Sequence, residues 1–527
     1  MDETLTMEQM FSTQRSLLSL LTIFTILLVK HIWNNAPDLS INLEPGTPSG
    51  PVQSPDPTPK TVTVPQARPH PIIDKVLYPS DAAYPTRILE AINKPPPANV
   101  DNPTKKVAKI DCRDLPNGAD VVIVLRTSAT TIYQDLPLHQ LTTFRCALHF
   151  LVFSDVSQRV AEQNVLDVLN IVNKETRNSH PDFEVYRKLQ EIAQQGGRMQ
   201  DLAEEARKLE KWKMLPMIRR TLQLHRTKKW FMFLDADTFV SWPNLLRWIE
   251  RLNSEDYVYA GMPVFDGERV WADGGSGFLL SRPAARKVAD AYPGHLSEWE
   301  TRTNEISSGD RLLGEVLAEV GVPLLYSSPH VQDRSLASME WTAMQWCRPA
   351  VTLHDVSTED QDRMWQFEQV WIRQMGAHEP ILFADWYANI VDDWMPEMKE
   401  SWNNSALEWR LDGDGMLSQH AAEENKDVKD AEACRALCEM KQDCLQWLWQ
   451  PGKCTGSSRI RLGSPADGEL RKSGTQESKG LVSGWMIERI NRTRTAMELC
   501  NSEKQWITNN TDWYEMMAAG TGYPSHG

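Results

Sequence analysis

The chain has too little positive charge to be a nucleic-acid-binding protein. Its 527 residues include 56 Lys and Arg against 71 Asp and Glu, a formal net charge of −15. Because a nucleic-acid interface needs a basic face to neutralise phosphates, this balance excludes that class. The mean hydropathy of −0.45 likewise excludes a protein with many membrane spans. The length allows two to four domains, and 41% hydrophobic residues suffice for a large core.

One apolar segment does lie near the N-terminus. Residues 17–29 carry no charge, and residues 16–33 approach the ~20 residues that a helix needs to cross a membrane. A cleaved signal peptide is the alternative, but no small-residue cleavage motif follows and the preceding residues are poorly basic. We therefore expect a cytoplasmic tail at 1–15 and an uncleaved transmembrane signal anchor at 16–33.

Proline is concentrated in the segment that follows. Between Ala36 and Val100 lie 15 of the 32 prolines. Proline favours extended polyproline II conformation and removes backbone donors, so such a segment does not pack into a core. The composition predicts a stem at 34–105 that holds the remaining chain away from a membrane.

Cysteine is absent before residue 112, and all eight cysteines follow the expected anchor. Five of them lie in the last hundred residues, and N-x-Ser/Thr acceptors occur in the same C-terminal part of the chain, at Asn403, Asn491 and Asn509. Disulfides and N-glycans both form in the secretory pathway, so we expect a type II protein with a lumenal body. The odd number of cysteines in this part leaves their pairing open.

Short apolar runs alternate with helical patterns over the expected body. The runs lie at 121–125, 147–155, 230–240 and 256–264, and the helical patterns at 183–195 and 209–224. Such alternation predicts an α/β fold with a largely parallel sheet. Ligand sites of these sheets lie beyond the carboxyl ends of the strands, where Asp155, Asp235 and Asp237 would be found.

The central motif is Asp235-Ala236-Asp237, which follows five apolar residues. Residues two apart in an extended segment project to the same side, so both carboxylates can face one ion. Mg²⁺ and Mn²⁺ prefer such oxygen ligands and complete their shells with phosphate oxygens. The alternative is a pair of turn residues at a strand end.

Three further motifs contain candidate site residues. The segment 271–281 has three glycines around Ser276, which allow a ligand to approach the backbone closely or form a flexible turn. Asp310 begins a helical pattern, either as its N-cap or as a general base. His354 follows an apolar run as a metal ligand or a structural histidine. The basic residues between Arg207 and Lys229 face a diphosphate or form a solvated helix face.

Four segments occur in a fixed order behind the expected anchor: FLDADTFV, WADGGSGFLLS, SSGDRLLG and VTLHDV. In this order they resemble the Fringe and core 1 galactosyltransferase family of inverting family 31 glycosyltransferases. The segments RTSATTIYQDLP and FRCALHFLVFSD, with the cysteine-rich tail, resemble its fungal branch. The resemblance covers roughly residues 120–365. It implies a GT-A, Rossmann-like α/β domain at 106–376 that binds a UDP-sugar through Mn²⁺ or Mg²⁺.

The resemblance also implies roles for individual residues. Asp237 matches the direct metal ligand of the family, Asp235 its companion, and His354 the downstream histidine ligand. Asp310 matches the base that takes a proton from the acceptor hydroxyl as it attacks the anomeric carbon. Gly309 stands where the family often has an acid. The remaining matches fall where contacts with the UDP-sugar are expected: Arg126, Thr127, Asp155, Gly274 and Gly275.

The tail contains a second pattern, with cysteines at 434, 438, 444 and 454. This spacing resembles a PAN or apple module, a small disulfide-rich α+β unit that binds protein or carbohydrate. A structural cap without a ligand is the alternative. We expect a linker at 377–425 and the module at 426–527.

Together these features predict a Golgi or ER/Golgi membrane enzyme. It is expected to transfer a sugar, galactose in our prediction, from a UDP-sugar to a glycan or glycoprotein hydroxyl in β-1,3 linkage. A second copy of the chain is a further candidate partner. One alternative is a haloacid-dehalogenase-type phosphatase, but Phe239 stands where its motif requires Thr or Val. The other is a non-catalytic lumenal lectin that uses the apple-like module.

Overall fold

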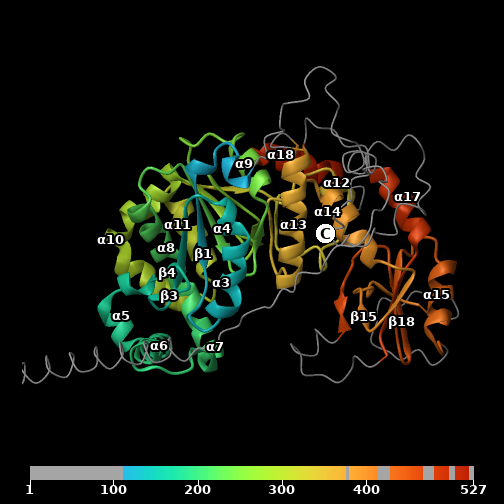
Figure 1. Ribbon diagram of the computed structural model, residues 1–527, viewed down its shortest axis with the longest axis horizontal. Coiled ribbons are helices and arrows are strands. Elements are labelled where there is room, and N and C mark those ends of the chain that lie inside the picture. Colours follow the sequence, from blue (N-terminus) through green and yellow to red (C-terminus); the bar gives the residue numbers. More distant parts are fainter. Residues whose placement is uncertain (1–110, 376–378, 412–427, 467–479, 498–504, 521–527) are drawn as a thin grey trace, which may run out of the picture. The chain divides into compact units, whose positions relative to one another are not determined.

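The computed structural model describes residues 111–375, 379–411, 428–466, 480–497 and 505–520 (Figure 1). The expected tail at 1–15, anchor at 16–33 and stem at 34–105 lie outside these residues. Among the residues described, no helix combines the length and apolar character needed to cross a membrane.

An eight-stranded mixed sheet forms the centre of the body. Its strands are β1 (Val121–Arg126), β2 (Phe150–Ser154), β3 (Gln158–Val160), β4 (Gln163–Asp167), β5 (Trp230–Asp235), β7 (Tyr259–Gly261), β10 (Phe278–Ser281) and β11 (Leu324–Tyr326). Their order is β11-β7-β10-β5-β1-β2-β4-β3. Strand β1 pairs in parallel with β2 and β5, whereas β10 runs antiparallel to both of its neighbours. The predicted α/β fold with a parallel-rich sheet is confirmed.

Helices cover both faces of this sheet (Figure 1). One face packs against α6 (Phe183–Gln195), α8 (Glu210–Leu224), α10 (Arg282–Glu305) and α11 (Gly309–Glu319). The other packs against α3 (Ile132–Leu141) and α9 (Trp242–Ile249). Alternate residues of β1 point to opposite faces, with Val122 and Val124 in one core and Ile123 in the other. Because both faces are buried, β1 reads as a continuous apolar run.

A small three-stranded sheet follows the end of β5. It has the order β12-β13-β6 and consists of β6 (Phe239–Val240), β12 (Val331–Gln332) and β13 (Thr352–Leu353). Strand β13 pairs with β6 antiparallel, so that Leu353 lies opposite Phe239. This pairing brings the residue after β13, His354, beside the residues that follow β5.

The buried side chain of Asn244 joins three segments of the body. Its Nδ2 donates to the carbonyls of Ala350 and Ile381, both at 2.7 Å, and its Oδ1 accepts from the Ile381 N–H at 3.0 Å. This one amide therefore connects α9 to the strand β13 region and to residues beyond α13 (Thr358–Met375).

A second, five-stranded antiparallel sheet lies in the C-terminal part. Its elements are β14 (Met398–Glu400), β16 (Trp409–Arg410), β17 (Gln446–Gln450), β18 (Lys453–Ser457) and β20 (Val482–Trp485), with helices α15 (Ala431–Met440) and α17 (Ile487–Met497). Strands β14 and β16 lie within the expected linker at 377–425, so the sheet begins before residue 426. Both are short edge strands whose backbone pairs with distant residues, and they lack an apolar alternation that the sequence pattern would reveal.

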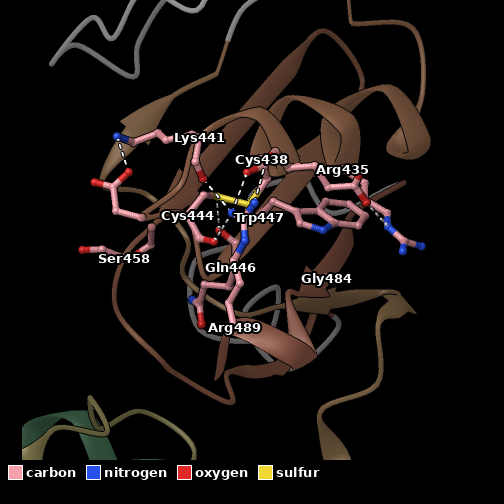
Figure 2. Close-up of a disulfide and its surroundings, with 12 residues drawn as sticks. Arg435, Cys438, Lys441, Cys444, Gln446, Trp447, Ser458, Gly484 and Arg489 are labelled. Atoms are coloured by element: carbon pink, nitrogen blue, oxygen red, sulfur yellow. Dashed lines mark hydrogen bonds and ion pairs between the residues drawn. A yellow bond between two sulfur atoms is a disulfide. The ribbon is translucent and has the colours of Figure 1, made fainter. Parts of the chain in front are cut away.

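Disulfides fasten α15 to this sheet. Cys434 pairs with Cys454 and Cys438 with Cys444, as Figure 2 shows for the second pair. The Arg489 guanidinium of α17 donates to the carbonyls of Cys438 and Cys444. In the body, Cys112 pairs with Cys146. The predicted disulfide-rich C-terminal part is confirmed, and Cys500 lies outside the described residues.

The segment 505–520 packs on the body, although it was expected to be part of the C-terminal module. His330 Nε2 accepts from the Ile507 N–H at 2.8 Å, and Trp248 Nε1 donates to the Ile507 carbonyl at 3.0 Å. At the start of α18 (Asn510–Gly520), the Asn510 side chain bonds the Tyr326 N–H and the Leu324 carbonyl. These bonds satisfy the open edge of β11, which would otherwise expose unpaired backbone groups.

We predict that Asn244→Ala destabilises the protein. The substitution leaves two buried carbonyls and one buried N–H without their partner, a loss of about 3 kcal/mol. Thermal unfolding followed by circular dichroism should show a midpoint lowered by several degrees. Asn253→Ala, which removes hydrogen bonds from an exposed turn, is the matched control and should leave the midpoint nearly unchanged. Equal midpoints for the two variants would contradict the role of Asn244.

Candidate functional site

The candidate site lies at the carboxyl ends of the two central strands. Arg126 ends β1 and Asp235 ends β5, and the two residues are register partners. The guanidinium of Arg126 contacts the Asp235 carboxylate through two bonds, Nε to Oδ1 at 2.6 Å and Nη2 to Oδ2 at 2.5 Å. Burial disfavours the charge of Arg126, but the neighbouring Asp235 outweighs it and raises the pKa of the guanidinium. This two-point contact fixes the orientation of Asp235.

Asp237 faces His354 across the strand ends. His354 Nε2 lies 3.3 Å from Asp237 Oδ1. The His354 N–H donates to the Gln332 carbonyl, and the Val356 N–H donates to the Asp237 carbonyl, so backbone bonds hold both residues. Burial disfavours the charged imidazole, but the hydrogen bond and charge of Asp237 raise the pKa of His354 to about 9. In return, His354 lowers the pKa of Asp237 against its desolvation.

Asp235, Asp237 and His354 have the chemistry and the spacing of a cation site. One potential ligand atom from each lies within 4.8 Å of the others. Carboxylate oxygens and an imidazole nitrogen suit Mn²⁺, and the oxygens suit Mg²⁺. The predicted grouping of these three residues is therefore present, and its donor set fits a divalent cation.

Asp310 is not the N-cap of its helix. Ser308 has that position in α11, and its side chain accepts from the Arg311 N–H. The half-buried carboxylate of Asp310 accepts instead from the Gly274 N–H at 3.0 Å and from the Ser308 hydroxyl. Burial raises the pKa of Asp310, although the Gly274 bond and Arg126 act in the opposite direction. The helix-cap alternative is therefore wrong, and the carboxylate is directed toward the glycine segment.

Two glycines lie directly against the candidate residues. A Cβ on Gly274 would lie 3.1 Å from Asp310 Cβ, and a Cβ on Gly275 would lie 2.4 Å from His354 Cε1. The Thr238 hydroxyl fixes this turn by donating to the Gly275 carbonyl at 2.6 Å. Only residues without a side chain allow such an approach. The turn therefore lies between the candidate base and the candidate metal ligand.

Close packing also explains why residue 309 is a glycine. A Cβ at this position would lie 2.5 Å from the Lys211 carbonyl oxygen. The backbone of α8 therefore leaves no room for the acid that related sequences were expected to have there.

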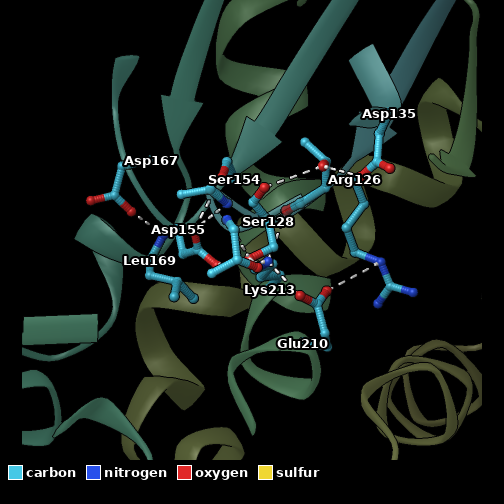
Figure 3. Close-up of polar contacts among 12 residues, drawn as sticks. Arg126, Ser128, Asp135, Ser154, Asp155, Asp167, Leu169, Glu210 and Lys213 are labelled. Atoms are coloured by element: carbon cyan, nitrogen blue, oxygen red, sulfur yellow. Dashed lines mark hydrogen bonds and ion pairs between the residues drawn. The ribbon is translucent and has the colours of Figure 1, made fainter. Parts of the chain in front are cut away.

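Asp155 differs from the expected nucleotide contact. It is fully buried, and its oxygens accept from the Ala129 N–H at 2.7 Å and the Ser128 hydroxyl at 2.9 Å (Figure 3). The buried ammonium of Lys213 lies 3.3 Å away and also bonds Glu210 at 2.6 Å. A buried charge must be paired, and here the pair shapes the turn after β1.

Thr127 is also turned into the protein. It is 5% exposed, and its hydroxyl bonds the Asp135 carboxylate at 3.1 Å. Neither Thr127 nor Asp155 therefore presents its side chain to a ligand in this structure. Lys213 lies among the basic residues that were expected either to face a diphosphate or to form a solvated helix face, and the structure buries it beside Asp155 instead. Its only sequence signal was its place among the buried positions of α8.

A pocket of about 420 Å³ opens beside Arg126 and Asp310. Three of the basic residues singled out in the sequence line it, namely Arg207, Lys208 and Lys211. Lys211 also forms an ion pair with Asp182 at 3.2 Å. Asp182 and Glu210 also line the pocket, so basic and acidic side chains lie together beside the Asp310 carboxylate.

Comparison with known protein families matches part of the chain. Residues 117–340 match the Fringe family, described as Fringe-like. Among solved structures, the chain is similar to a glycosyltransferase involved in the glycosylation of the major capsid of PBCV-1. That likeness has 11% sequence identity, 47% coverage of this chain, 98% coverage of that chain and a TM-score of 0.26. No curated protein sequence matches the chain. The Fringe-like match supports a glycosyltransferase domain and contains all the candidate residues except His354.

We predict that Gly275→Ala weakens cation binding without unfolding the protein. The new methyl group would displace the His354 ring from Asp237, and disturbed ligand positioning lowers metal affinity about 10- to 100-fold. Isothermal titration with Mn²⁺ measures the change. Gly294→Ala is the matched control, because an added Cβ meets nothing within 4 Å there. Unaltered Mn²⁺ affinity in a folded Gly275→Ala protein would show that His354 is not a ligand.

Proposed function

We propose that the chain is an inverting, metal-dependent glycosyltransferase that uses a UDP-sugar donor. The observation that carries the proposal is the glycine turn at 274–275, which contacts Asp310 on one side and His354 on the other. A proton acceptor and a cation site thus lie next to each other within the Fringe-like part of the chain. Galactose is our proposed sugar and β-1,3 our proposed linkage.

One set of residues is proposed to bind the donor, and another to act on the acceptor. Asp235, Asp237 and His354 would hold a divalent cation, with Arg126 keeping Asp235 in place. Such a cation, when bound, neutralises the charge of a departing diphosphate. In the adjoining pocket, Lys208 adds further positive charge for an anionic donor, whereas the charge of Lys211 is paired with Asp182.

Asp310 is the proposed general base. Its carboxylate would take the proton of an acceptor hydroxyl as that oxygen forms a bond to the anomeric carbon and the bond to UDP breaks. Attack from the face opposite UDP inverts the anomeric configuration, so an α-linked donor gives a β-linked product. Burial raises the pKa of Asp310, which makes the ionised carboxylate a better proton acceptor.

We further propose that the enzyme acts in the Golgi or ER/Golgi lumen on glycan or glycoprotein acceptors. Disulfides in both the body and the C-terminal sheet support an oxidising compartment. The anchor at 16–33 remains part of this proposal. So does a PAN or apple-like role for the C-terminal module, supported by its helix and disulfide-linked antiparallel sheet.

We predict that Asp237→Ala abolishes metal-dependent donor binding while the protein stays folded. The purified full chain is titrated with a panel of UDP-sugars, with and without Mn²⁺, and UDP release without acceptor is followed. Asp362→Ala is the control, since Asp362 belongs to another Asp-x-Asp and its carboxylate accepts from Gln366 on the same helix. Binding of one UDP-sugar that Asp237→Ala leaves intact would remove the metal role. A folded wild-type chain that binds no UDP-sugar would favour the lectin-like alternative.

We predict that Asp310→Asn retains donor binding but loses sugar transfer. An amide cannot accept the hydroxyl proton, and loss of a general base lowers turnover about 10²- to 10⁴-fold. Transfer to a panel of oligosaccharide acceptors is measured beside donor affinity. Asp290→Asn on the exposed surface of α10 is the control and should keep full turnover. Near-normal turnover of Asp310→Asn would reduce Asp310 to a structural residue.

A further inference from the structure

Four aromatic side chains cluster where the edge of the central sheet meets α18. Phe265 lies in β8 (Pro263–Asp266), Tyr326 ends β11, and Trp513 and Tyr514 lie in α18. Ring centroids of Tyr326 lie 5.6 Å from Phe265, 5.2 Å from Trp513 and 6.0 Å from Tyr514. We call these four residues the aromatic shelf. Their mutual contacts make them one continuous surface.

The aromatic shelf is exposed to solvent. Phe265 is 55% exposed and Tyr514 56% exposed, although both are large apolar side chains that folding usually buries. A contiguous apolar patch on a soluble surface marks a binding site more often than scattered exposed residues do. The bonds of Asn510 to β11 hold α18 in register beside Tyr326, so the rings are preorganised.

The shelf lies close to the candidate base. Tyr326 pairs with Gly261 across one strand spacing of about 4.8 Å. The next residue, Met262, accepts at its carbonyl from the Asp273 N–H at 2.8 Å, and Asp273 precedes the glycine that bonds Asp310.

The hairpin of β8 and β9 (Arg269–Ala272) also connects the aromatic shelf with the residues around Asp310. Asp266, next to Phe265, lies 3.4 Å from the guanidinium of Arg311, the neighbour of Asp310. The Arg311 guanidinium also lies over the Trp271 ring. The shelf is therefore one hairpin away from the carboxylate that would receive the acceptor proton.

We infer that the aromatic shelf binds pyranose rings of the acceptor glycan, outside the residue that receives the new sugar. This inference rests on the proposed function. The C–H faces of a pyranose pack on exposed aromatic rings, while the tyrosine hydroxyls at the ring edges bond sugar hydroxyls. The Fringe-like match ends at residue 340 and so contains neither Trp513 nor Tyr514. The shelf is thus completed by a segment outside the matched domain.

The size of the shelf argues against a second copy of the chain as the occupant. Each aromatic side chain offers about 150–250 Å², and these four are roughly half exposed or less. Their combined exposed area is far below the ~800 Å² per partner of a stable protein interface.

The test uses the full chain with Phe265 and Tyr514 both changed to Ala. An array of defined neutral oligosaccharides is probed with the wild type and the variant, and KM and kcat are measured for an acceptor. The double variant should lose array binding and raise the acceptor KM at least about tenfold. Its kcat, UDP-sugar affinity and acceptor-free UDP release should stay at wild-type values, because neither residue contacts the donor site.

Tyr257→Ala is the matched control. Tyr257 is 52% exposed and precedes β7, at the opposite strand end from the shelf. Unchanged array binding and KM in the double variant would overturn the inference. So would a wild-type dimer in sedimentation that the double variant abolishes without any change in glycan binding. Failure of the wild type to release UDP would instead refute the proposed function, while the array still tests the shelf.

Discussion

The site depends on a steric constraint at the glycine turn between β9 and β10. Gly274 contacts Asp310 and Gly275 contacts His354, and a Cβ at either position would push against these side chains. Because the turn is also held by the Thr238 and Thr352 hydroxyls, it acts as a fixed spacer between α11 and the strand that ends at Leu353. The distance between a proton acceptor and a cation site is thereby set by backbone packing. Rigid backbone is a more accurate spacer than flexible side chains.

Charge pairing then gives the neighbouring carboxylates different properties. Asp235 is held by the guanidinium of Arg126, and Asp237 by the imidazole of His354. Asp310 accepts instead from the Gly274 N–H and the Ser308 hydroxyl, and its burial raises its pKa. The pKa of Asp237 is thus lowered and that of Asp310 raised. Carboxylates whose pKa values are shifted in opposite directions can serve separately as a metal ligand and as a proton acceptor. Beneath these residues, the buried ion pair of Asp155 and Lys213 supports the turn after β1 and thus the position of Arg126.

The sequence predicted the helices and strands whose buried apolar residues recur at a regular spacing. The helix expected at 183–195 begins and ends at Phe183 and Gln195, and the apolar run before Asp235 is β5. Motif order also singled out Asp235, Asp237, His354 and Asp310, which the structure brings together. Residue type alone does not reveal whether a carboxylate faces solvent or neutralises a buried lysine, so the pairing of Asp155 with Lys213 was not predicted. Edge strands β14 and β16 were missed because their pairing is non-local and their own sequence has no alternation.

Residues 505–520 pack on the body, so the folded unit that contains the candidate site includes a segment from near the C-terminus. The Asn510 amide closes the edge of β11, and His330 and Trp248 fix Ile507 by backbone bonds. The matched domain at 117–340 therefore contains a sheet edge and two buried side-chain polar groups, on His330 and Trp248, whose hydrogen-bond partners lie in residues 505–520. Since buried polar groups without partners are costly, this segment is integral to the body. The same helix that satisfies the edge also carries Trp513 and Tyr514, so stability of the sheet and the shape of the surface beside Asp310 are determined together.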